Sequence, residues 1–121
     1  MTDVKGYLTT HVLDTGLGLP AADLHIDLYV LEDNTRRHIR SVRTNNDGRT
    51  DGPILPSEEF KLGVYELVFQ TMDYLKRTAS AQKEPFFLAD IPIRFGINDL
   101  DAHYHVPLLL SPYGYSTYRG S

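Results

Sequence analysis

The sequence predicts an all-β protein, a β-sandwich of seven or eight short strands with one brief helix. Hydrophobic and polar residues alternate along most of the chain, which is the period of strands with one buried face. Clusters of Gly, Pro, Asn and Asp separate these segments, as is typical of strands joined by turns. The chain has 121 residues, of which 41% are hydrophobic and 23% charged. We therefore expect one globular domain over residues 1–121.

Two segments show the alternation most clearly. Between Leu24 and Val30 the even-numbered residues are aliphatic, whereas the odd-numbered ones are His, Asp and Tyr. From Phe87 to Ile97 the odd-numbered residues are apolar, which predicts a long half-buried strand, and Pro92 indicates a free or bulged edge. One helix is expected at Thr71–Ala79, with Thr71 or Asp73 capping its start. Further strands are expected at residues 7–13, 37–44, 61–69, 103–110 and 113–119.

Charge and composition exclude several classes of function. The chain carries 12 Lys and Arg against 16 Asp and Glu, a net charge of −4, which argues against a nucleic-acid or anionic-membrane surface. No apolar run approaches the ~20 residues of a membrane span, and the N-terminus lacks the apolar core of a signal peptide, so a cytoplasmic location is expected. The absence of cysteine excludes disulfides and thiolate catalysis. Arg36, Arg37, Arg40 and Arg43 lie together, and we interpret them as a solvated edge rather than an anion site.

The histidines can be sorted by the face of the strand on which they lie. In the first strand Leu8 and Val12 take the buried parity, which directs His11 outward, and the same reasoning directs His103 and His105 outward. The Cα atoms of His103 and His105 should lie about 6–7 Å apart, a spacing that suits two ligands of a zinc centre completed by His11. It suits equally a general base beside an exposed neighbour. Because no other feature demands a metal, none is expected.

Two further features could carry function. Arg49 follows the tight turn Asn46-Asp47-Gly48, where its guanidinium could bind a planar anion or carbonyl group, or could simply be exposed. The tail from Tyr113 to Ser121 contains three tyrosines, which suggests that the end of the chain is docked. The sequence contains no serine-nucleophile elbow, phosphate-binding glycine loop or paired carboxylates of a glycosidase.

These features coincide with a resemblance to a known family. Residues 8–21, LTTHVLDTGLGLPA, resemble the start of the transthyretin-related proteins, and residues 46–49, NDGR, resemble their central turn. The ending, from HYHVP at 103–107 to YRGS at 118–121, resembles the 5-hydroxyisourate hydrolases in particular, because the hormone-carrying transthyretins lack that terminal tetrapeptide. The resemblance implies a transthyretin-like (prealbumin-like) sandwich of two four-stranded sheets with one short helix. It also implies a homotetramer, a dimer of dimers, with active sites at the dimer–dimer interface.

The resemblance further implies hydrolysis of 5-hydroxyisourate to 2-oxo-4-hydroxy-4-carboxy-5-ureidoimidazoline in urate degradation, without a cofactor. His105 would be the general base, and His11 its hydrogen-bonding partner or the proton donor to the leaving nitrogen. Arg49 would stabilise negative charge on the carbonyl oxygen. The tail would position the substrate and exclude water, through Tyr118, Arg119, Gly120 and Ser121. The alternative is a transthyretin-like tetramer that binds a small aromatic ligand without catalysis.

Overall fold

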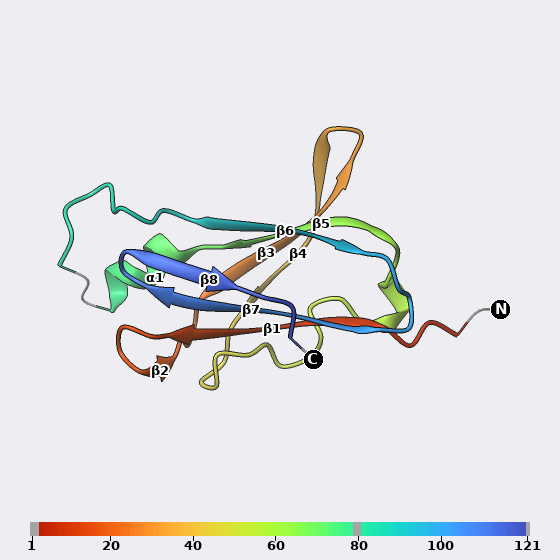
Figure 1. Ribbon diagram of the computed structural model, residues 1–121. Coiled ribbons are helices and arrows are strands. Elements are labelled where there is room, and N and C mark those ends of the chain that lie inside the picture. Colours follow the sequence, from red (N-terminus) through yellow and green to blue (C-terminus); the bar gives the residue numbers. More distant parts are fainter. Residues whose placement is uncertain (1–2, 79–80, 121) are drawn as a thin grey trace.

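The computed structural model describes residues 3–78 and 81–120, which form two layers of β-sheet (Figure 1). The first sheet has the strand order β2-β1-β7-β8 and the second the order β4-β3-β5-β6. The two predicted four-stranded sheets are therefore confirmed. The strands are β1 (Tyr7–Asp14), β2 (Leu19–Pro20), β3 (His25–Glu32), β4 (Thr35–Arg43), β5 (Gly63–Phe69), β6 (Ile91–Ile97), β7 (His103–Ser111) and β8 (Gly114–Thr117).

The inner faces of the two sheets form the hydrophobic core. Leu8 and Val12 on β1 are fully buried, as are Leu108 and Leu110 on β7 and Leu67 on β5. Buried and partly exposed residues alternate along the whole of β1, as the sequence predicted. The outer face of the first sheet is thus left to Tyr7, Thr9 and His11 and their neighbours on β7.

Two helical segments lie outside the sheets, and neither is long and apolar enough to cross a membrane within the residues that the structure describes. The short 3-10 helix η1 spans Ser57–Glu59, and α1 spans Thr71–Arg77 between β5 and β6. The predicted cap of α1 is wrong, because Gln70 holds the capping position without a side-chain hydrogen bond. The hydroxyl of Thr71 instead donates to the carbonyl of Ala89 in the segment before β6. Ala79, the predicted end of this helix, lies outside the described residues.

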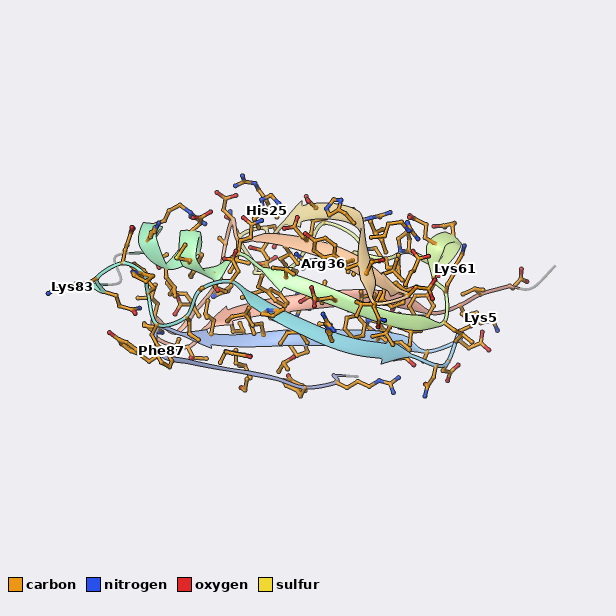
Figure 2. All side chains as sticks on the ribbon, turned by 90° about the horizontal axis from the view of Figure 1, so that it is seen from above. Lys5, His25, Arg36, Lys61, Lys83 and Phe87 are labelled. Atoms are coloured by element: carbon orange, nitrogen blue, oxygen red, sulfur yellow. The ribbon has the colours of Figure 1, made fainter. Side chains whose placement is uncertain are left out.

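The predicted strand from Phe87 to Ile97 is shorter in the structure, where β6 begins at Ile91. Phe87 breaks the expected alternation with 71% of its surface exposed, whereas Phe86 is buried. The segment before Ile91 is therefore an irregular connection anchored by Phe86, and Figure 2 shows Phe87 pointing outward at the end of the sandwich that carries α1. Pro92 does lie on an edge strand, as predicted.

Ion pairs cover much of the outer face of the second sheet. Each of the four clustered arginines meets a carboxylate, in the pairs Arg36–Glu66, Arg37–Glu32, Arg40–Glu59 and Arg43–Asp23. Figure 2 shows Arg36 over the middle of this sheet. Because every guanidinium of the cluster is paired internally, the structure supports a solvated edge over an anion site.

Candidate functional site

Parallel pairing of β1 with β7 brings the outward histidines onto one surface. The register places Tyr7 beside His103, Thr9 beside His105 and His11 beside Pro107. Side chains alternate between the two faces of a strand, and paired residues of neighbouring strands point to the same face. The side chains of all these residues therefore lie on the outer face of the first sheet. His11 and His105 are therefore diagonal neighbours, a relation that strand parity alone could not establish.

The turn before Arg49 is clamped against β1. Asn45 Oδ1 accepts hydrogen bonds from the backbone N–H groups of Asp47 and Arg49, at 2.9 and 3.2 Å. Gly48 has φ of +74°, and a Cβ there would lie 2.3 Å from the carbonyl oxygen of Val12, so only glycine fits this approach. The result is a backbone bridge between His11 and Arg49. The guanidinium of Arg49 is thus delivered to the histidine surface by a rigid turn.

Hydrogen bonds orient the three imidazoles. Nε2 of His11 donates to the carbonyl oxygen of Asp47 at 2.9 Å, so the lone pair of the neutral ring lies on Nδ1. Thr9 Oγ1 lies 2.7 Å from Nδ1 of His105 and 2.6 Å from Nε2 of His103. The ring of His103 also stacks on that of Tyr7, with centroids 4.2 Å apart.

Local electrostatics favour neutral imidazoles. Partial burial, assisted by the positive charge of Arg49, lowers the pKa of His11 below its ordinary value. Burial also lowers the pKa of His105, with additional contributions from His103, Arg49 and His11. A neutral imidazole can accept a proton, so the site favours histidines that act as bases at neutral pH.

A cavity of about 470 Å³ opens over this surface. Its walls include Thr9, Arg49, His103 and His105, together with Pro53 from the loop after Arg49. Within residues 3–78 and 81–120, no group of three His, Cys, Asp or Glu side chains is arranged to hold a metal ion. The cavity thus brings two imidazoles together with the guanidinium of Arg49.

The tail divides between this site and a second cavity. Gly120 forms a backbone bridge with His105, and its N–H donates to the His105 carbonyl at 2.7 Å. Tyr118 and Arg119 instead line a cavity of about 330 Å³ beside β6, where the Arg119 guanidinium lies over the ring of Tyr104. Their predicted contact with substrate stays a prediction. Ser121 lies outside the described residues.

Sequence reasoning did not assign functions to Thr9 or to the stacked pair of Tyr7 and His103. Their outward parity was visible in the sequence, and His103 was considered as a zinc ligand. The shared hydrogen-bonding partner of the two histidines was not visible, because Thr9 and His105 are 96 residues apart in the chain.

Comparisons with known proteins show the family to which the chain belongs. Residues 8–120 match the model of the HIUase/Transthyretin family. The chain is 60% identical to 5-hydroxyisourate hydrolase 2 of Rhizobium meliloti, over 97% of this chain and 98% of that protein. It is 51% identical to a 5-hydroxyisourate hydrolase of Pseudomonas aeruginosa, over 96% and 92% of the two chains.

Solved structures of related proteins share the fold of this chain. A Klebsiella pneumoniae 5-hydroxyisourate hydrolase superposes with a TM-score of 0.80 at 28% identity, covering 96% of this chain and 99% of that one. Transthyretin from Sparus aurata gives a TM-score of 0.83 at 25% identity, covering 93% and 95%. An (S)-allantoin synthase gives 0.91 at 44% identity, but this chain spans only 45% of that longer chain.

Proposed function

Because the chain belongs to the HIUase/transthyretin family, we propose that it is a 5-hydroxyisourate hydrolase whose active site is the outer face of β1 and β7. One observation carries the assignment to this face: His11, Arg49 and His105 meet there, although they come from three separate parts of the chain. A carrier of an apolar aromatic ligand would have no need of this polar group, so the binding-protein alternative is not favoured.

The proposed reaction is the attack of water on the C6 carbonyl of 5-hydroxyisourate, which breaks the bond from C6 to N1. His105 takes a proton from the water, because its lowered pKa keeps the imidazole neutral at neutral pH. The guanidinium of Arg49 stabilises the negative charge that develops on the carbonyl oxygen. The neutral ring of His11 has its lone pair on Nδ1. His11 either hydrogen-bonds to His105 or transfers a proton to the leaving nitrogen. The substrate is already oxidised, so the proposal needs no cofactor.

The tail completes the proposed site. The contact of Gly120 with His105 supports a role in holding the base, and Ser121 follows it directly in the sequence. Tyr118 and Arg119 would anchor the tail from the neighbouring cavity. We propose that these residues position the substrate and limit the access of water.

We also propose that the protein is a homotetramer, a dimer of dimers, in which the outer face of the first sheet meets another subunit. The support is the family, together with an open catalytic face that a neighbouring subunit would enclose. The match over residues 8–120 supports a single transthyretin-like domain over residues 1–121. A cytoplasmic location stays a prediction.

A coupled assay tests the function. Urate oxidase generates 5-hydroxyisourate in situ, and the decay of its absorbance is followed with and without the protein. His105→Ala should lower the rate by about 10²-fold or more. The matched control is His25→Ala, because His25 is also half-buried but lies on the other sheet. No acceleration by the wild-type protein would refute the proposed function, and equal rates for His105→Ala and wild type would refute the role of His105.

A further inference from the structure

The feature that the proposed reaction leaves unexplained is the hydroxyl of Thr9, which lies between two imidazoles. Its distances to Nδ1 of His105 and Nε2 of His103 are 2.7 and 2.6 Å, both within the range of strong hydrogen bonds. A hydroxyl carries one hydrogen, so at least one of these ring nitrogens must donate to it. The protonation of His103 and that of His105 are therefore linked through Thr9.

The two ways of ordering this link give His105 opposite roles. If Nδ1 of His105 donates to Thr9, the lone pair of the ring is on Nε2 and His105 is ready to act as a base. If Thr9 donates to Nδ1 instead, Nε2 carries the hydrogen and His105 is ready to act as an acid. Since Thr9 occupies Nδ1, proton exchange with a substrate must use Nε2.

The surroundings indicate where a positive charge is best tolerated. His105 lines the same cavity as Arg49 and His103, and the positive charges of His103, Arg49 and His11 all contribute to lowering its pKa. His103 is the first residue of β7, pairs with Tyr7 on β1 and stacks on its ring. His103 lies farther along the sheet than His105 from the bridge between His11 and Arg49. A positive charge on His103 is therefore farther from the backbone of Arg49 than a positive charge on His105 would be.

We propose that Thr9 and His103 form a proton relay behind His105, so that one histidine serves first as the base and then as the acid. This inference rests on the proposed hydrolysis. At rest Nδ1 of His105 donates to Thr9, and the Thr9 hydroxyl donates to Nε2 of His103. Thr9 and His103 are positioning residues, because neither needs to touch the reacting atoms.

The protons balance through one turnover. When water attacks C6, its proton moves to Nε2 of His105, the proton on Nδ1 moves to Thr9, and the hydroxyl proton of Thr9 moves to His103. His103 is then an imidazolium, and His105 is neutral with its hydrogen on Nε2. As the bond from C6 to N1 breaks, Nε2 gives its proton to N1. The relay then runs backward and restores the resting state.

Kinetics of four variants test the relay. Thr9→Val removes the hydroxyl at nearly constant shape and should lower kcat by about 10- to 100-fold, with KM changed by less than about twofold. Thr9→Ser keeps the hydroxyl and should recover most of kcat. His103→Phe keeps a ring to stack on Tyr7 and should lose as much as Thr9→Val. The double variant of Thr9→Val with His103→Phe should be no slower than either single one, because the two residues act as a unit.

A second measurement reads the tautomer of His105 without any turnover. In ¹⁵N spectra of labelled histidine at alkaline pH, the relay requires the hydrogen of His105 to lie on Nδ1 in the wild type and in Thr9→Ser, and to redistribute in Thr9→Val. Circular dichroism and Tm should match among these proteins. An unchanged kcat in Thr9→Val, an additive loss in the double variant, or a hydrogen on Nε2 in every protein would overturn the relay. Loss of wild-type hydrolysis would instead refute the proposed function, which separates the two conclusions.

Discussion

A methyl group added at Gly120 should damage catalysis without unfolding the protein. A Cβ at this position would lie 2.6 Å from Cδ2 of His105 and 3.3 Å from its Cβ and Cγ. The Gly120 N–H donates to the His105 carbonyl at 2.7 Å, so the backbone cannot retreat without losing that hydrogen bond. Gly120→Ala must therefore displace the imidazole or detach the tail.

The size of the effect follows from the overlap. Carbon atoms in contact normally lie about 3.5–4.0 Å apart, so relief of the 2.6 Å contact requires a movement of about 1 Å. A misplacement of about 1 Å in a catalytic group can cost about 10²-fold in rate. We expect kcat/KM of Gly120→Ala to fall by about that factor. Tm should change little, because Gly120 lies outside the named strands and outside the hydrophobic core cluster.

The matched control is Gly114→Ala at the start of β8, the strand that precedes Gly120. The nearest atom to a Cβ there is Ser111 Oγ at 3.7 Å, an ordinary van der Waals distance. The coupled assay at equal protein concentration compares the two variants, and thermal unfolding monitored by circular dichroism verifies the fold. If Gly120→Ala is as active as Gly114→Ala, the tail does not hold His105 and the reasoning from this contact is wrong.

Four further predictions address the charge, pH, tail and core. Arg49→Ala should lower kcat/KM by about 10²-fold. It should also move the acid limb of the pH–rate profile to higher pH, because the guanidinium helps to lower the pKa of His105. Initial rates measured across pH report both effects, and an acid limb at the wild-type pH would contradict the link between Arg49 and His105. In the wild type the active neutral form of His105 should persist below the ordinary pKa of 6.5 and be lost as pH falls through the lowered pKa; a constant rate between about pH 5 and 8 would argue against a histidine base. Deletion of residues 118–121 should abolish activity while circular dichroism stays unchanged, with light scattering to measure the oligomer; a fragment as fast as the full chain would leave the tail without a catalytic role. Tyr74→Phe removes a buried hydrogen bond of 2.8 Å to Asp14 and should lower the free energy of unfolding by about 1–3 kcal/mol in urea titrations; unchanged stability would show that this bond contributes nothing net.

Local patterns in the sequence predicted the strands because alternation is a local property. The outward direction of His11 and His105 followed from the same parity, and the structure confirms it. The segment from Phe87 to Ala89 shows where this reasoning fails. Its hydrophobic and polar residues alternate, but the segment pairs with no strand in the described part of the chain and forms a loop in the structure. A pattern of side chains cannot reveal whether a neighbouring strand is present to accept the hydrogen bonds.

The assembly of the site could not be predicted from parity, because it depends on pairing between distant segments. Nothing in the local sequence states that Thr9 lies beside His105, or that Arg49 bridges to His11. The resemblance to a family supplied the relevant residues, whereas the register supplied their relation. Thr9 was missed because a threonine on an outward face is ordinary until its two partners are known.

The parallel pairing of β1 and β7 also determines when the first sheet can form during synthesis of the chain. Strand β1 must wait for a partner that follows much later in the chain, since Tyr7 pairs with His103. Contacts between such distant segments are entropically costly to close, and folds dominated by them form in about milliseconds to seconds. On the ribosome β1 therefore remains without its neighbour β7 until that strand has been translated. A nascent chain that lacks β7 would leave the backbone hydrogen-bonding groups along this edge of β1 unpaired, and such edges make incomplete chains prone to aggregate.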